Sequence, residues 1–252
     1  MKRLLLSAIF ILTMIIPSAS FALPLVDAEI AVGGWLNSPS GFAGYNGDDL
    51  NLEDDLGYEA ETSIMGRIRI ELPFLLPNFT VMATSLSYDG DGKLANTFDF
   101  GNTDFTANMN FHSKLKLDHQ DFALSFSLPL LNLATLGKLQ ADLGVNLRLL
   151  DLEASIEQDN IKESKSITIP IPMGYAYLRL EPIDGLAVEA EGRGLVIGDN
   201  SMKSFIGRLR YNIIGPLFVA GGYRLETIDI NEEGIRINTE FRGPFIESGF
   251  KF

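Results

Sequence analysis

The sequence contains no cysteine, two histidines, one tryptophan and, after its first residues, no long apolar run. Without cysteine the chain forms no disulfide bond and carries no lipid on a cysteine. With two histidines it offers few candidates for acid–base or nucleophilic chemistry. Without a further run of roughly 20 apolar residues, no membrane-spanning helix is predicted beyond the leader.

The first residues have the features of a secretory leader. Lys2 and Arg3 precede a mostly apolar stretch from Leu4 to Ile16, and small residues at 20 and 22 fit a signal peptidase site. We predict cleavage after Ala22, which leaves residues 23–252 as the mature chain. The alternative, a membrane anchor, is disfavoured because the apolar stretch is shorter than the roughly 20 residues of a spanning helix.

The chain is acidic. Its formal net charge is −13, and removal of a leader with two basic and no acidic residues brings it to about −15. A nucleic-acid partner is therefore not expected, because that affinity comes mainly from Lys and Arg on phosphates. Seven acids gather between Asp48 and Glu61. A solvated surface loop is the favoured interpretation of this segment, and an ion site is the alternative.

Alternation of apolar and polar residues is the recurrent pattern, and it predicts β-strands. It is strongest from Leu139 to Leu149, where odd positions are apolar and even positions are polar or Gly. A strand separates such residues onto two faces, whereas a helix mixes them. Comparable stretches are 27–36, 61–72, 79–88, part of 112–128, 166–180, 186–194, 205–213, 217–227 and 234–252.

This pattern gives about ten strands, and eight or twelve also fit because strand boundaries are the least certain feature of a sequence. Short connections rich in Pro and Gly alternate with long polar ones at 37–60 and 89–110, as periplasmic turns and extracellular loops do. Residues 97–107 are expected to form a hairpin that projects above the membrane. The predicted fold is an all-β, antiparallel, up-and-down transmembrane β-barrel, formed by one domain from residue 23 to 252.

Two predicted strands change phase. In the last strand the apolar residues of 235–241 and those of 246–252 have opposite parity. A β-bulge at Gly243-Pro244 would reconcile the two halves, since Pro lacks the donor of a regular ladder. A similar switch is expected around 118–121.

A soluble β-sandwich also alternates, so other features must decide which face points outward. The polar faces carry charges of both signs, which suits a closed, paired interior, and aromatic residues lie near strand ends, as in interfacial girdles. The final strand runs to the last residue, where soluble chains often fray. We therefore favour a barrel of the Gram-negative outer membrane, with Phe250 and Phe252 as the signal for the barrel-assembly machinery.

Several short segments, each weak alone, occur in a fairly specific order. They are Gly33-Gly34-Trp35, Asp54-Asp55-Leu56-Gly57, Leu72-Pro73-Phe74-Leu75-Leu76-Pro77-Asn78, Phe98-Asp99-Phe100-Gly101, Glu189-Ala190-Glu191-Gly192, Gly221-Gly222-Tyr223-Arg224 and Gly243-Pro244-Phe245. In these segments and the closing Phe252 the chain resembles a small, poorly characterised family of proteobacterial outer-membrane β-barrel proteins. The resemblance implies a fold and a location, and it carries over no catalytic residues.

Candidates for catalysis are few. His119 and Asp121 are two apart on a predicted strand and so share a face, which resembles half of a protease-like Asp/His arrangement. His112 and Ser113 are adjacent and point to opposite faces. Since no Ser/His/acid set is found, we interpret the histidines as surface residues near the barrel mouth and predict that the chain is not an enzyme. Residues 89–93 lack ligands that a Ca²⁺ loop needs, so no metal or cofactor is predicted.

The predicted lumen is narrow and contains charges of both signs. Two interpretations stay open: the charges pair into a structural plug, or they line a small, weakly selective pore. The lumen-lining candidates are Arg67, Arg69, Glu71, Asp142, Arg148, Glu189, Glu191, Arg193, Arg208, Arg210, Arg224 and Glu226.

We therefore predict a monomeric outer-membrane protein, in contact with lipid and lipopolysaccharide, with three candidate functions. The first is a narrow small-solute channel. The second is a plugged structural or interaction barrel whose acidic extracellular loops bind cations, lipopolysaccharide or a partner. The third, a minor candidate, is an outer-membrane hydrolase that uses His119 and Asp121.

Overall fold

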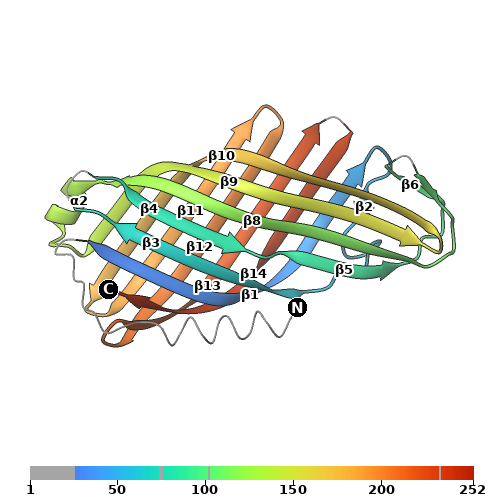
Figure 1. Ribbon diagram of the computed structural model, residues 1–252. Helices are drawn as coiled ribbons and strands as arrows, with labels where there is room; N and C mark the ends of the chain where they lie inside the picture. Colours follow the sequence, from blue (N-terminus) through green and yellow to red (C-terminus); the bar gives the residue numbers. More distant parts are fainter. Residues whose placement is uncertain (1–25, 74–75, 102, 233) are drawn as a thin grey trace.

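The computed structural model describes residues 26–73, 76–101, 103–232 and 234–252, and the predicted leader lies outside these ranges. The described chain is almost entirely β-strand (Figure 1). Its elements are β1 (Asp27–Tyr45), β2 (Leu50–Asn51), β3 (Glu61–Glu71), β4 (Asn78–Thr84), β5 (Ser87–Gly92), β6 (Phe98–Phe100), β7 (Thr103–Phe105), β8 (Phe111–Ser127), the helix α2 (Pro129–Ala134), β9 (Leu139–Gln158), β10 (Ile161–Ile183), β11 (Leu186–Ile197), β12 (Asn200–Ile214), β13 (Leu217–Glu232) and β14 (Ile235–Lys251). Among the described residues, no helix is long and apolar enough to cross a membrane.

The long strands close into one antiparallel barrel. Neighbours in the chain are neighbours in the sheet, and β14 pairs with β1 from Lys251↔Glu29 to Ile235↔Tyr45. β4 and β5 are successive pieces of one barrel strand, since both pair with β8 on either side of a break at 85–86. The prediction of a ten-stranded up-and-down barrel is therefore confirmed. β2 and the separate β6–β7 hairpin are short additions to it.

The barrel has two unlike ends. One, which we call the terminal end, carries the start of β1, the end of β14 and the connections at 72–73, 76–77, 128–138, 184–185 and 215–216 (Figure 1). The other, the loop end, carries the long segments 46–60, 93–101 and 103–110, the tight turns after β9 and β11, and the end of β13. Positive φ at Gly185 (82°) and Gly215 (54°) allows two-residue turns at the terminal end.

The half of the barrel near the terminal end is apolar outside and charged inside. Phe122 and Leu143 are exposed, whereas the adjacent Asp121 and Asp142 are buried. On β9 the outward apolar residues run from 141 to 149, close to the 9–11 residues with which a tilted strand spans a bilayer. This arrangement is the reverse of a soluble sandwich and is the one that lipid requires.

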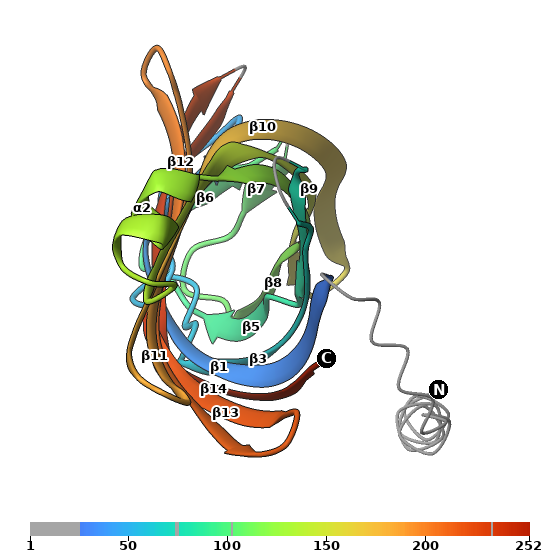
Figure 2. The ribbon, with the colours of Figure 1, turned by 90° about the vertical axis from the view of Figure 1, so that its left-hand side faces the viewer.

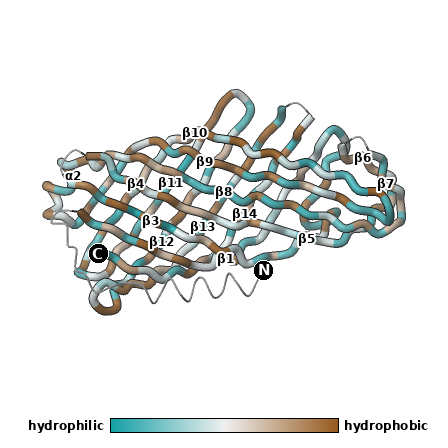
Figure 3. The backbone as a smooth tube through the Cα atoms, viewed as in Figure 1, coloured by the Kyte–Doolittle hydropathy of each residue, from teal (hydrophilic) through white to brown (hydrophobic). Residues whose placement is uncertain are grey.

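The pattern inverts toward the loop end, at a level that we call the inversion line. On β8 Leu115 and Leu117 are buried, while Asp118 faces outward. On β9 Leu150 and Leu152 are likewise buried. Figure 3 shows apolar and polar residues alternating along these strands. The burial of the side chains shows that the apolar residues face outward on one side of the inversion line and inward on the other.

This inversion corrects the bulges expected from the sequence. The β14–β1 register stays constant from one side of Gly243-Pro244 to the other, and so does the β13–β14 register. The β8–β9 register is equally regular through 118–121. The change of hydrophobic parity reflects a change of surroundings, from lipid to water, and not an extra residue in the strand.

Several strands are longer than predicted because they continue past the inversion line. β1 reaches Tyr45 where the sequence suggested an end near Leu36, and β9 and β10 extend to meet at 158–161. Inside this extension the barrel has an apolar core, like a soluble protein. Its buried members include Trp35, Leu50, Leu52, Leu56, Tyr58, Met65, Met82, Leu86, Tyr88, Phe98, Phe100, Phe105, Phe111, Leu115, Leu117, Leu150, Leu152, Ile156, Ile171, Met173, Met202, Ile206, Ile228, Phe241 and Phe245.

Glycines allow the wall to bend sharply. At Gly144, Gly222 and Gly243 an added Cβ would lie about 2 Å from a carbonyl oxygen of the neighbouring strand, at distances of 2.0, 2.0 and 1.9 Å. Only a residue without a side chain permits such close approach of two strands. These positions set the curvature that closes a narrow barrel.

Candidate functional site in the barrel lumen

The lumen between the terminal end and the inversion line is the candidate site, because it concentrates buried charge. All twelve residues nominated from the sequence place their side chains here, from β3, β9, β11, β12 and β13. Eleven of them are buried, and Glu71 is partly exposed at the terminal end. What the structure adds is how these side chains pair across the lumen.

The cluster nearest the inversion line is centred on Arg148 and Glu226. Arg148 Nε lies 2.9 Å from Asp121 Oδ1, and Arg148 Nη1 lies 3.0 Å from Glu226 Oε2. Glu226 also accepts hydrogen bonds from Arg224 and, at 3.0 Å, from Ser204 Oγ. Two arginines and one carboxylate thus converge at a fully buried point.

Arg224 connects this cluster to the apolar core. Its guanidinium lies over the indole of Trp35, 4.5 Å from the ring centre. The ring faces supply a cation–π attraction that partly replaces the hydration the arginine loses. The charged network of the lumen and the apolar core are therefore in direct contact at Arg224 and Trp35.

The middle cluster is centred on Arg208. Three carboxylates surround it, with nitrogen–oxygen distances of 3.2 Å to Glu189, 3.3 Å to Glu191 and 3.5 Å to Glu247. Arg67 Nη2 of β3 reaches Glu247 of β14, two strands away, at 2.8 Å. Since β3, β11, β12 and β14 all contribute, the cluster joins the walls across the lumen.

The cluster at the terminal end is centred on Arg69. It pairs with Asp142 and, through Nε at 2.7 Å, with Glu71. The ring of Tyr177 lies 3.8 Å from its guanidinium carbon. Arg210 of β12 also lies over an aromatic ring, with its guanidinium carbon 3.9 Å from the centre of the Phe218 ring.

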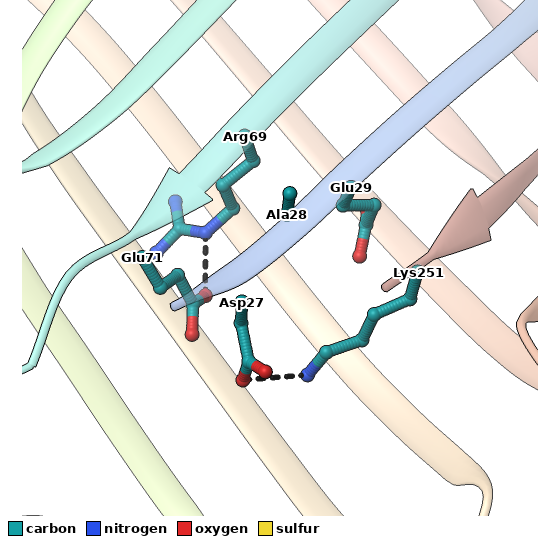
Figure 4. A pocket seen from close by; sticks show the side chains of 6 residues that line it. All are labelled: Asp27, Ala28, Glu29, Arg69, Glu71 and Lys251. Carbon is teal, nitrogen blue, oxygen red and sulfur yellow. Dashed lines mark hydrogen bonds and ion pairs between the residues drawn. The ribbon is translucent and has the colours of Figure 1, made fainter. Parts of the chain in front are cut away.

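A small pocket marks the place where β1 begins and β3 and β14 end (Figure 4). Asp27, Ala28, Glu29, Arg69, Glu71 and Lys251 line it. Most of the charged side chains that line it pair with one another. Arg69 pairs with Glu71, and Lys251 Nζ lies 3.2 Å from Asp27 Oδ2. It has no room for a water molecule, so it is a closed seam and not a ligand site.

A larger groove, of about 320 Å³, lies on the wall and not in the lumen. Outward-facing small residues, Ala141, Ala176, Ala190 and Gly192, form its floor, with Phe205 at one side. Its position in the apolar band makes it part of the lipid-facing surface.

Opposite charges balance in the buried part of the lumen. Seven arginines (67, 69, 148, 193, 208, 210 and 224) face seven carboxylates (29, 121, 142, 189, 191, 226 and 247). An unpaired buried charge costs several kcal/mol, roughly 3–5 when one partner is removed. Equal numbers of opposite charges offset much of that cost, although some guanidinium nitrogens of the network, such as Arg193 Nη1 and Arg210 Nη2, have no hydrogen-bond partner among the described residues.

Sequence reasoning did not nominate Glu29, Asp121 or Glu247 as lumen residues. Glu29 alternates with the exposed Ile30, and that parity was available in the sequence. Glu247 alternates in the same way with the exposed Ile246 of the last strand. Asp121 was considered only as a partner for His119. For all three, the signal was the parity of the outward apolar residues.

His119 is buried in the lumen, which corrects its interpretation as a surface residue. Its Nδ1 lies 2.9 Å from the carbonyl oxygen of Leu117, and its Nε2 lies 3.0 Å from Arg224 Nη2. Nδ1 therefore donates and Nε2 accepts, so neither nitrogen is free to act on a substrate. His112 is at the surface and contacts Asp91 at 3.0 Å.

The loop end is sealed by segments that fold inward. Leu50, Leu52 and Leu56 of the 46–60 segment are buried in the apolar core, although most of the acids beside them, such as Glu53 and Asp54, stay exposed. The expectation of a wholly solvated loop is therefore wrong for its leucines. Burial raises the pKa of the Tyr58 phenol to about 12, and Asp89 adds to this effect, so the side chain stays neutral.

The β6–β7 hairpin is part of the same seal. Phe98 and Phe105 stack with ring centres 5.1 Å apart, and Phe98 contacts Phe111 of the wall at 5.0 Å. The hairpin predicted at 97–107 is thus present, but it packs its aromatic side chains on the core instead of projecting freely. Within the described residues, no group of three or more His, Asp or Glu side chains is placed to hold a metal ion.

The last residues close the barrel. The Phe252 N–H donates to the Ala28 carbonyl at 2.8 Å, and the rings of Phe250 and Phe252 stack 6.4 Å apart. Both aromatic side chains are exposed at the terminal end. Their role as an assembly signal stays a prediction.

Comparison with known proteins identifies no sequence family. No family model matches the chain, and no curated protein matches it. Among solved structures it is similar to the outer membrane protease OmpT from Escherichia coli, with 10% identity, a TM-score of 0.48 and coverage of 92% of this chain and 98% of that one. It is also similar to the translocator domain of the autotransporter NalP from Neisseria meningitidis (9% identity, TM-score 0.42, coverage 92% and 90%) and to Ail of Yersinia pestis (9%, 0.36, 90% and 99%).

Proposed function

We propose that this protein is a non-conducting β-barrel of the Gram-negative outer membrane, with a plugged lumen that acts as a scaffold. The apolar band with charged residues inside supports the membrane location, because lipid accepts only a closed barrel with an apolar exterior. The terminal end then faces the periplasm and the loop end faces outward. The observation that carries the proposal is the neutral network of seven arginines and seven carboxylates across the lumen.

The channel that the sequence also suggested is less well supported. A conducting path would have to pass the Arg148–Glu226 cluster and then the apolar core, where residues such as Trp35 and Phe241 are fully buried. Opening it would separate several buried ion pairs at once, at a cost of several kcal/mol for each. The charged network and the apolar core lie one after the other along the lumen, so both would have to move to open a path.

Planar-bilayer conductance of the refolded mature barrel tests this proposal. We expect no discrete openings from protein whose folding is verified by heat-modifiable gel mobility, because the charged network and the apolar core both remain in place. A general porin in the same bilayers is the positive control. Discrete openings whose ion selectivity changes in an Arg208→Gln variant would instead make the lumen a pore and refute the plug.

A second function is favoured by the charge of the loop end, which we propose binds a cationic ligand. The segments 46–61 and 85–110 contain eleven acids and one lysine. Glu53 and Asp54 are exposed, and they can be changed without touching the buried leucines beside them. The negative electrostatic potential of these acids attracts positively charged partners, and salt weakens the attraction.

Neutralising these acids tests the second function. In a Glu53→Gln, Asp54→Asn double variant we expect weaker binding of a lysine-rich peptide, measured at low salt by fluorescence anisotropy. The charge-matched control is Asp27→Asn with Asp184→Asn, two exposed acids at the terminal end. Equal binding by both variants would contradict a site at the loop end.

A further inference from the structure

The connection between β8 and β9 exposes an unusual amount of apolar surface. Leu130, Leu133 and Leu136 are 80%, 73% and 91% exposed, and α2 contains no buried residue. Between 122 and 141 the only charged residue is Lys138. Soluble surfaces rarely present such a cluster to water, so it marks a surface that something apolar covers.

The segment is held in this conformation by specific hydrogen bonds. Thr135 Oγ1 donates to the Leu131 carbonyl at 2.7 Å and accepts from the Leu139 N–H at 3.0 Å. The Gly137 N–H donates to the Asn132 carbonyl at 2.8 Å, in a turn where Gly137 has a φ of +82°. The leucines are therefore presented by an ordered, capped turn.

Its position makes the turn continuous with the lipid-facing band. Phe126 faces outward near the end of β8, Leu128 is exposed just after it, and Leu143 faces outward near the start of β9. Figure 2, in which the terminal end faces the viewer, shows α2 beside the wall and not across the opening of the barrel. The helix thus extends the apolar exterior and does not plug the lumen.

We propose that α2 is a membrane anchor that lies in the phospholipid leaflet at the terminal end. Its leucines enter the boundary between head groups and acyl chains, and the exposed Lys138 meets the phosphates at the edge. Charge complementarity supports lipid as the occupant, because the single charge of the segment is positive and phospholipid head groups are anionic. The inference rests on the proposed membrane location and is independent of whether the lumen conducts.

A single labelled cysteine tests the anchor, and the chain is suited to it because it has no cysteine of its own. Leu133→Cys is labelled with the environment-sensitive dye NBD and refolded into vesicles of phosphatidylcholine and phosphatidylglycerol. The matched control is Asp184→Cys, in an exposed turn at the same end. We expect blue-shifted emission and quenching by brominated lipid at 133, and water-like emission with iodide quenching at 184.

Two results would overturn the anchor. Equal iodide quenching at 133 and 184 would put α2 in water. A blue shift at 133 that fades on dilution of protein in lipid, without quenching by brominated lipid, would assign the leucines to contact between two copies of the chain. Heat-modifiable mobility of each labelled variant verifies folding, and the bilayer recordings of the unlabelled protein test the plug separately.

Discussion

Replacing Glu226 with Gln is expected to lower the free energy of unfolding by about 3–5 kcal/mol, because the variant leaves two buried guanidinium groups without their shared counter-ion. Glu226 lies between Arg148, at 3.0 Å, and Arg224, and both arginines are fully buried. Gln keeps the volume but replaces one acceptor oxygen with an NH2 donor, so the loss reports the charge together with the hydrogen bonds of that oxygen. Urea unfolding in lipid vesicles measures it, followed by the fluorescence of Trp35, the only tryptophan in the chain.

The matched control is Glu157→Gln. Glu157 also forms an ion pair, with Lys162 at 3.0 Å, but the two side chains are 51% and 61% exposed. Solvent screens such a pair, so its loss should cost less than about 1 kcal/mol. Similar effects for the two substitutions would mean that the lumen is hydrated enough to screen its charges, and the plug would lose its energetic basis.

Gly243→Ala is expected to destabilise the barrel by about 3 kcal/mol, the upper end for overpacking, because the new methyl group has no space. An added Cβ would lie 1.9 Å from the carbonyl oxygen of Leu36 and 3.0 Å from its carbonyl carbon. These are backbone atoms of β1, so the seam that closes the barrel must shift. The Trp35 indole also donates to the Gly243 carbonyl at 3.2 Å, which ties the seam to the apolar core.

Gly221→Ala provides the comparison at a strand glycine with space. Its nearest neighbour, the Phe245 carbonyl oxygen, would be 3.6 Å from the new Cβ, an ordinary contact. We expect that variant to refold with unchanged heat-modifiable mobility, while Gly243→Ala yields a smaller folded fraction. Equal refolding yields would show that the seam tolerates widening.

The outline of the fold could be predicted from sequence parity alone, because a strand in lipid must alternate. The stretch from Leu139 to Leu149 is the clearest case: its leucines face outward and Asp142 and Arg148 face inward. The charged lumen follows from the same rule. Its pairing does not, since Arg67 and Glu247 are 180 residues apart in the chain and meet only when the barrel closes.

The rule that apolar residues of one parity face outward fails where a strand passes from lipid into water. A switch in the parity of the apolar residues arises either from a bulge or from an unbroken strand that leaves the membrane, and alternation alone does not distinguish the two. For β14 the sequence analysis predicts a bulge, whereas the strand is unbroken. Likewise, the acids of the 46–60 segment suggested a loop in water, while Leu50, Leu52 and Leu56 lie buried in the core. In β14 and in the 46–60 segment the outcome depends on contacts between residues far apart in the chain, which the local sequence pattern does not indicate.

The inversion line also determines how deeply the barrel sits. A displacement inward by one residue pair would move Asp118 of β8 and Asp151 of β9 into the edge of the hydrocarbon, at a cost of up to about 1 kcal/mol each that grows with depth. A displacement outward would strip lipid from Phe126 and Leu143. Movement of the barrel along the membrane normal is therefore unfavourable in both directions, and a bilayer of different thickness deforms around the barrel instead.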